Sequence, residues 1–118
     1  MDNTSQDCLF CKIASGEIPA DIVYQDETCL AFRDIAPEAP THILVIPRRH
    51  IDTTDDLTSE DAALISRIVL TATQVARDEK LVEEGYRMVW NCNEGAGQTV
   101  FHIHLHLLGG RGFGWPPG

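Results

Sequence analysis

Apolar and polar residues alternate along several short stretches of the chain, which is the pattern of strands with one buried face. Five such stretches predict strands: residues 22–25, 29–33, 42–46, 86–91 and 101–108. The polar pair Asp26-Glu27 separates the first two stretches and predicts a hairpin. The third is a strongly β-forming run that stops at Pro47, so we expect it to be a central strand.

Helical periodicity occurs in two places. Residues 59–80 carry apolar side chains at spacings of three and four: Leu64, Ile65, Ile68, Val69, Ala72, Val75 and Ala76. This stripe predicts one long helix that packs on the sheet and begins at the hydroxyl and acidic residues 58–61. A short helix is expected over residues 8–14, with Asp7 as its N-cap. Together these elements predict an α+β fold with a mainly antiparallel five-stranded sheet.

Length and charge narrow the class of protein. With 118 residues the chain is expected to be a single domain, residues 1–118, of which 1–6 form a frayed tail. Its 9 basic and 18 acidic residues give a formal net charge of −9, which opposes binding to nucleic acid. The polar N-terminus has no apolar signal region and no stretch approaches a membrane span, so we expect a cytoplasmic protein without a membrane partner.

Three of the five histidines lie in the last alternating stretch. Successive side chains of a strand point to opposite faces, so His102, His104 and His106 are expected to share one face. The apolar residues between them would face the core: Phe101, Ile103, Leu105 and Leu107. Three imidazoles on one rigid strand suit metal ligation or nucleophilic and acid–base chemistry near neutral pH. The glycine-rich residues 93–99 come directly before them and would let backbone amides approach a phosphate.

These residues also resemble a known family. His-x-His-x-His followed by two apolar residues resembles the signature of the histidine triad superfamily. Further segments are similar to its HINT branch, in the same order along the chain: Asp34-Ile35 and residues 39–42, 44–47, 97–100 and 115–118. The resemblance implies a nucleotide-binding hydrolase that cleaves the P–N bond of purine nucleoside 5′-phosphoramidates and releases the nucleoside monophosphate.

The resemblance also implies a role for each histidine of the group. The middle one, His104, would attack phosphorus and form a nucleotidyl-histidine intermediate, with no cofactor needed for catalysis. Imidazole can do this without a second base when its other ring nitrogen donates to a backbone carbonyl. His106 would contact the phosphate or leaving group, His102 would orient the set, and His42 would hydrogen-bond within the cluster.

A nucleoside needs an apolar slot and an acceptor for its ribose hydroxyls. By resemblance the acceptor is Asp34, for which capping of its own loop is the alternative. The apolar wall is expected from Phe10, Ile13, Ile18, Phe32 and Ile35. Phosphate contacts are expected from Asn91, Gly97, Gln98, Thr99 and His106, with Asn93 as the alternative to Asn91.

Four cysteines in a chain without an export signal are expected to be thiols or metal ligands rather than disulfides. Cys8-x-x-Cys11 has the spacing of a zinc half-site. Resemblance to bacterial-type triad proteins implies that His50 and His102 complete a structural zinc site, and a pair of reduced thiols is the alternative. We expect Cys29 in the core and Cys92 beside the glycine-rich loop, where it could be sensitive to oxidation.

The last segment, residues 109–118, is too rich in glycine and proline to form an element of its own. In the HINT branch the C-terminus reaches the other subunit's active site, so we expect a two-fold homodimer with sheets continuing across the interface. Docking of Trp115 on its own chain is the alternative.

Three other functions compete with the phosphoramidase. They are a dinucleoside polyphosphate hydrolase, a nucleotide-binding interaction module with incidental hydrolysis, and a zinc-stabilised regulatory domain. The intact third histidine, His106, favours the phosphoramidase over the dinucleoside polyphosphate hydrolase.

Overall fold

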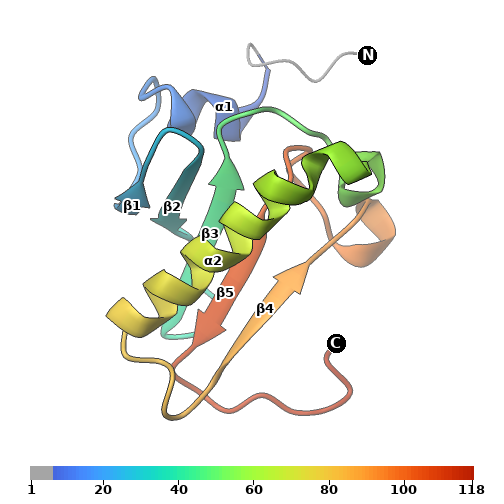
Figure 1. The fold of residues 1–118 in the computed structure, drawn as a ribbon. Coiled ribbons are helices and arrows are strands. Elements are labelled where there is room, and N and C mark those ends of the chain that lie inside the picture. The colour runs from blue at the N-terminus through green and yellow to red at the C-terminus, as the bar shows by residue number, and fades with distance from the viewer. Residues whose placement is uncertain (1–6) are drawn as a thin grey trace.

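Five strands form one antiparallel sheet in the order β1-β2-β3-β5-β4 (Figure 1). The strands are β1 (Ile22–Gln25), β2 (Cys29–Arg33), β3 (Thr41–Pro47), β4 (Tyr86–Trp90) and β5 (Leu105–Gly109). Two α-helices accompany them, α1 (Leu9–Ala14) and α2 (Ala62–Asp78). The computed structural model describes residues 7–118, so the tail expected at 1–6 lies outside the described residues. The α+β fold predicted from the sequence is confirmed.

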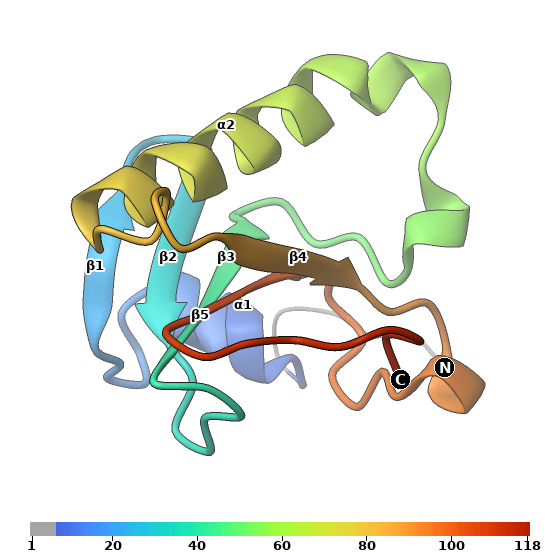
Figure 2. The same cartoon turned by 90° about the horizontal axis from the view of Figure 1, so that it is seen from below.

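The two helices lie on opposite faces of the sheet (Figure 2). Because side chains alternate along a strand, β3 sends Ile43 and Val45 to the α2 face, and Leu44 and Ile46 to the α1 face. In the described residues, no helix is long and apolar enough to cross a membrane.

The predicted long helix forms with shifted ends. Residues Ser59–Asp61 make a 3₁₀ turn before α2, closed by a capping box between Thr58 and Asp61. The α-helix ends at Asp78 rather than at Lys80, because Lys80 has left the helical region with a φ of 61°. Its predicted stripe packs against the sheet: Ile68, Ala72, Val75 and Ala76 are buried, with Leu64, Ile65 and Val69 beside them. This face holds the larger core.

Two terminal assignments from the sequence need correction. The N-cap of α1 is Cys8 and not Asp7, because the Cys8 sulfur accepts from the backbone N–H of Cys11 at 3.3 Å. The last strand, β5, begins at Leu105 and not at Phe101. The ladder with β3 stops at the pair Val45–Leu105, because the N–H of Ile103 donates to the carbonyl of Ile51 instead.

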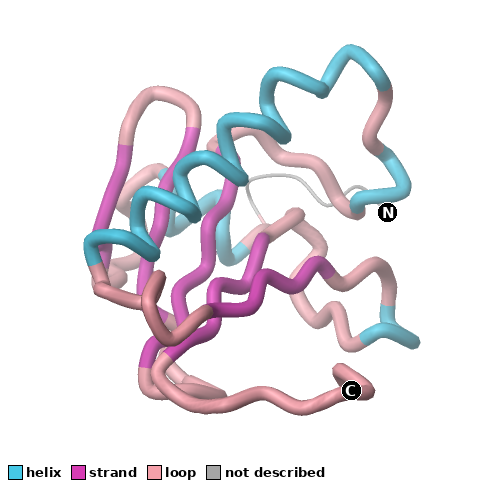
Figure 3. The backbone as a smooth tube through the Cα atoms, turned by 60° about the horizontal axis from the view of Figure 1, so that its bottom comes forward, coloured by secondary structure: helices cyan, strands magenta, loops and turns pink. Residues whose placement is uncertain are grey.

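The expected alternation nevertheless holds before β5 begins. Ile103, Leu105 and Leu107 are buried in the α2-side core, as predicted. Phe101, also expected there, is only half-buried and lies outside both cores. After β5 the C-terminal segment runs back along β4 (Figure 3), to which it is tied by Arg87, whose Nη2 donates to the carbonyl of Gly114 at 2.9 Å.

Candidate active site

Three histidine rings lie next to one another on the α1 face of the sheet. His42 comes from β3 and His106 from β5, where His106 pairs with Leu44, two residues beyond His42. The ring centroids of His42 and His106 are 5.2 Å apart, and those of His104 and His106 are 5.0 Å apart. Strand alternation therefore places the predicted histidines in one cluster.

The backbone fixes the tautomer of His104. Its Nδ1 lies 2.8 Å from the carbonyl oxygen of His102, and because a carbonyl only accepts, the proton must be on Nδ1. Nε2 then carries a free lone pair. The residue is 8% exposed, and the Phe10 ring packs edge-on against its ring with 5.0 Å between the centroids. Burial lowers the pKa of His104, so the ring is neutral and nucleophilic at neutral pH.

His42 and His106 form a chain of directed hydrogen bonds. The backbone N–H of Glu38 donates to Nδ1 of His42 at 3.0 Å, so a neutral His42 carries its proton on Nε2. That Nε2 lies 2.9 Å from Nδ1 of His106 and donates to it. His106 must then carry its own proton on Nε2, which has no hydrogen-bond partner within residues 7–118. This nitrogen is free to donate to a ligand.

Burial keeps the two imidazole rings of this hydrogen-bond chain uncharged. It lowers the pKa of His106 to about 4, and repulsion from His104 and His42 acts in the same direction. Burial also lowers the pKa of His42, against the opposing effect of Asp34. Neutral rings are what the chain requires, since a protonated His42 would repel the Glu38 N–H from Nδ1.

A cavity of about 390 Å³ opens beside these rings. It is lined by the expected residues Phe10, Ile13, Ile18, Phe32, Asp34, Ile35, Thr99, His104 and His106, together with Leu9, Pro19, Ala20, Arg33, Leu44 and Val100. The wall is mostly apolar, and it also contains the charged residues Arg33 and Asp34 and the imidazoles of His104 and His106. A cavity of this size and character suits a small ligand with one flat apolar part and one anionic part.

Asp34 serves its own loop and faces the cavity. Its Oδ1 accepts from the backbone N–H of Ala36 at 2.9 Å, which is the loop-capping alternative. Its Oδ2 lies 3.5 Å from Nε2 of His42. The side chain is partly exposed, so one carboxylate oxygen remains accessible to a ligand.

The glycine-rich loop reaches the cavity at one end only. Thr99 lines it, whereas the Gln98 side chain is buried and bonded within the protein, accepting from the N–H of Asn93 and donating to the carbonyls of Asp52 and Val100. Asn91, not Asn93, borders a small second cavity with His106.

Gly97 stands beside Asn91. It has a φ of +98°, and a Cβ there would lie 4.0 Å from Nδ2 of Asn91. The structure therefore places Gly97 and Gln98 as supports of the loop, and their contact with phosphate stays a prediction.

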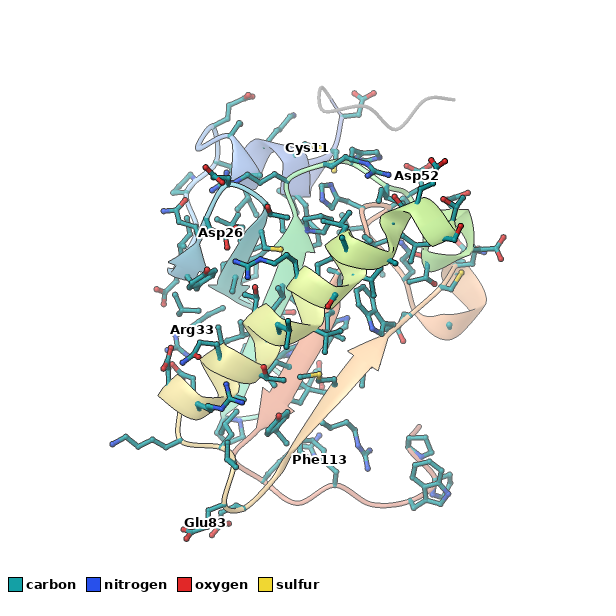
Figure 4. All side chains as sticks on the ribbon, in the orientation of Figure 1. Cys11, Asp26, Arg33, Asp52, Glu83 and Phe113 are labelled. Carbon is teal, nitrogen blue, oxygen red and sulfur yellow. The ribbon has the colours of Figure 1, made fainter. Side chains whose placement is uncertain are left out.

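The four predicted metal ligands converge at the other end of the histidine row. Their ligand atoms, from Cys8, Cys11, His50 and His102, all lie within 4.8 Å of one another. Cys11 on α1 and Asp52 after β3 lie at the same end of the sheet (Figure 4). The other two cysteines are apart from this cluster. Cys29 is buried in the α2-side core, as expected, and Cys92 is half-buried, where a hydrogen bond with Thr54 lowers the pKa of its thiol.

The ring orientations of this cluster fit a cation. Nε2 of His102 donates to the carbonyl of Pro47 at 2.8 Å, which leaves the Nδ1 lone pair facing both sulfurs at 3.3 and 3.4 Å. Nε2 of His50 donates to Asp52 at 2.6 Å, which likewise turns its Nδ1 toward Cys11. Such outer hydrogen bonds orient metal-binding histidines in proteins.

The protonation of Cys11 also bears on a cation. Burial and the neighbouring Cys8 raise the pKa of the Cys11 thiol to about 12, so a thiolate there needs a compensating positive charge. Two sulfurs and two imidazoles match the preference of zinc.

A family model described as the HIT domain matches residues 15–113. The chain belongs to the HIT family. Among HIT proteins it is 48% identical over 110 residues to the purine nucleoside phosphoramidase of Escherichia coli strain K12, covering 93% of this chain and 92% of the relative.

Two solved structures are similar to this chain in fold and in sequence. A HIT family hydrolase from Legionella pneumophila Philadelphia 1 has a TM-score of 0.93 and 58% identity, with 94% of this chain and 99% of that chain covered. A histidine triad nucleotide-binding protein from Candida albicans has a TM-score of 0.78 and 31% identity, with 92% and 82% covered.

Sequence reasoning expected a backbone carbonyl beside His104 without identifying it, and it missed the other groups that orient the HIT histidines. Four groups act through the backbone or as partners: the Glu38 amide, the His102 and Pro47 carbonyls, and Asp52. A backbone group leaves no trace in the sequence. Leu44 in the cavity wall could have been found, because it lies two residues after His42 and so on the same strand face.

Proposed function

We propose that this HIT protein is a hydrolase that cleaves the P–N bond of purine nucleoside 5′-phosphoramidates, including adenosine 5′-phosphoramidate, and releases the nucleoside monophosphate. The observation that carries the proposal is His104, whose Nδ1 proton is committed to a backbone carbonyl and whose Nε2 lone pair is free beside the cavity. The 48% identical Escherichia coli relative is a purine nucleoside phosphoramidase, which supports this reaction for the chain.

The reaction proceeds in two displacements at phosphorus. Nε2 of His104 attacks phosphorus, a P–Nε2 bond forms, and the P–N bond to the leaving group breaks. The electron pair departs with the leaving nitrogen, which takes up a proton from solvent and leaves as an amine, or as ammonia from the unsubstituted phosphoramidate. The ring of His104 now carries a positive charge, which the His102 carbonyl stabilises through the Nδ1 proton.

In the second displacement water attacks phosphorus, the P–Nε2 bond breaks, and the attacking water releases a proton to solvent. The nucleoside monophosphate leaves and neutral His104 returns. His106 donates from its free Nε2–H to the phosphate or to the leaving group, and the Glu38-to-His42 chain keeps that proton in place. His102 orients the set through its carbonyl, and no cofactor takes part in either displacement.

The nucleoside occupies the apolar part of the cavity. Its base lies against Phe10, Ile18 and Ile35, and Asp34 accepts hydrogen bonds from the ribose hydroxyls through its accessible carboxylate oxygen. Asn91, Gly97, Gln98 and Thr99 form the phosphate side of the site, with Thr99 nearest the cavity.

Steady-state assays on adenosine and guanosine phosphoramidates and on diadenosine polyphosphate test the substrate class. We expect wild type to cleave the phosphoramidates, and His104→Ala to lose cleavage while still binding nucleoside monophosphate. Preference for diadenosine polyphosphate would replace the proposal with a dinucleoside polyphosphate hydrolase. Nucleotide binding without any cleavage would replace it with a binding module.

We also propose that Cys8, Cys11, His50 and His102 hold a structural zinc ion, which would tie α1 to the loop after β3 and to the start of the histidine row. Purified wild type should then contain about one zinc per chain and melt at lower temperature after chelation. Cys11→Ser should lose both properties, whereas Cys92→Ser, outside the cluster, should keep them. Metal-free wild type with chelator-independent melting would contradict the site.

We also propose that the chain forms a homodimer. Trp115 is 84% exposed, so it does not dock on the described residues of its own chain, and β4 forms an outer edge of the sheet. A second copy that pairs along β4 would continue the sheet and cover the C-terminal segment 109–118. Analytical ultracentrifugation should give a dimer at micromolar concentration, and a monomer would contradict it.

A further inference from the structure

One arginine of the C-terminal segment reaches the loop that precedes β3. Nε of Arg111 donates to the backbone carbonyl of Glu38 at 3.0 Å. The backbone N–H of the same Glu38 donates to Nδ1 of His42 at 3.0 Å. Glu38 is therefore held on one side by the C-terminal segment and on the other by a histidine of the proposed site.

The segment is itself held where it passes this loop. The Phe113 ring, visible on the C-terminal segment in Figure 4, has the Arg111 guanidinium 4.3 Å from its centroid and that of Arg87 5.1 Å away. Gly110 has a φ of +90°, and a Cβ there would lie 2.8 Å from Cβ of Pro40, so the backbone packs directly on the end of the loop. Arg111 thus starts from an anchored position.

The position of the Glu38 N–H decides which ring nitrogen of His42 carries a proton, and through His42 it decides the same for His106. Its N–H makes Nδ1 of His42 an acceptor, so the proton of His42 lies on Nε2 and points to His106. If Glu38 moved away, either nitrogen of His42 could carry the proton. In the other tautomer Nε2 of His42 would accept, and the proton of His106 would turn to Nδ1 and away from the ligand.

We infer that Arg111 is a positioning residue for the reaction, which holds Glu38 so that its amide keeps His42 in one tautomer and His106 ready to donate from Nε2. The inference rests on the proposed function for its effect on rate, but not for its effect on the rings. Among the described residues, the hydrogen bonds and the ring contact of Arg111 go to Glu38, Gly112 and Phe113, none of which lines the cavity, so Arg111 acts through Glu38 and His42.

Nitrogen-15 spectra of the imidazole rings, together with kcat and KM for adenosine 5′-phosphoramidate, test it in the full chain. Wild type should show His42 and His106 each protonated at Nε2 only. In Arg111→Ala we expect averaged His42 nitrogen shifts, a kcat lower by about tenfold, and a KM that changes little, because the loss falls on the transition state.

Arg87→Ala is the matched control. It removes the same charge, a contact with the same Phe113 ring and a hydrogen bond to the same segment, but that hydrogen bond goes to Gly114 and not to Glu38. It should keep wild-type ring shifts and kcat, because the packing of Gly110 on Pro40 still holds the segment. The inference is overturned if Arg111→Ala keeps fixed ring tautomers, or if Arg87→Ala changes them equally. If wild type proves unable to cleave phosphoramidates, the proposed function fails and the ring spectra still decide the inference.

Discussion

Two histidines that lie two residues apart offer opposite ring nitrogens to their surroundings. A carbonyl occupies Nε2 of His102, so Nδ1 faces the sulfurs of the cysteine pair. A carbonyl occupies Nδ1 of His104, so Nε2 is left for the cavity. The backbone thereby turns one ring toward the proposed metal site and leaves the other ring with the free nitrogen that the proposed attack on phosphorus needs.

Asp34 allows its two roles to be separated by substitution. Asp34→Asn keeps an Oδ1 that can accept from the Ala36 N–H, but it removes the charge that we propose to face the ribose. We expect the Kd for nucleoside monophosphate to rise about tenfold, the loss of one charge-assisted hydrogen bond. The free energy of unfolding in urea should change by less than about 0.5 kcal/mol.

Calorimetric titration with nucleoside monophosphate measures the binding half of this prediction. Asp34→Ala, which also removes the loop cap, serves as the comparison and should lose both binding and some stability. Unchanged binding in Asp34→Asn would return this carboxylate to a purely structural role.

At the scale of elements, Gly110 directly follows β5 and packs on Pro40 in the loop before β3. Gly110→Ala would force a Cβ to within 2.8 Å of Pro40 in a backbone region, φ +90°, that alanine disfavours. We expect a loss of about 1–3 kcal/mol in the free energy of unfolding. Gly112→Ala, in open space and without a left-handed φ, should be near neutral in the same denaturant titration. Equal effects would mean that the segment does not pack on the loop.

Strand alternation predicted most of the elements, but not where β5 begins. The period of two placed His102, His104 and His106 on one face and Ile103, Leu105 and Leu107 in the core. The end of the ladder depends instead on the bond from Ile103 to Ile51, two residues far apart in the sequence.

The candidate site was predictable to a similar extent. Side chains of special chemistry, such as the cysteine pair and the histidine row, stand out in a sequence. The Glu38 amide and its support by Arg111 do not, because neither a backbone group nor a single surface arginine carries a pattern.

On the scale of the whole molecule, the two faces of the sheet carry different features. The α2 face buries the larger apolar core, and the α1 face carries Cys8, Cys11, the histidine row and the cavity. Burying neutral imidazoles on one face has a consequence for stability. The pKa of His106 is about 4 in the folded chain, against about 6.5 for a free side chain.

Stability should therefore fall as the pH drops from about 6.5 to 4. In this window the unfolded chain takes up protons that the folded chain refuses, so acid favours unfolding. Carboxylates such as Asp26, whose pKa is lowered by hydrogen bonds, act only below this range. Urea titrations at a series of pH values measure the slope, and His106→Asn should reduce it, while His42 and His104, whose pKa burial also lowers, keep part of it. Constant stability across the window would contradict neutral burial.

The most direct test of the function is rapid quenching of the reaction with adenosine 5′-phosphoramidate, followed by mass spectrometry of the intact chain and its peptides. Wild type should show a transient adduct of one adenylyl group on the peptide that contains His104. His104→Ala should show neither adduct nor turnover. Turnover that persists in His104→Ala, or an adduct on another residue, would contradict the mechanism.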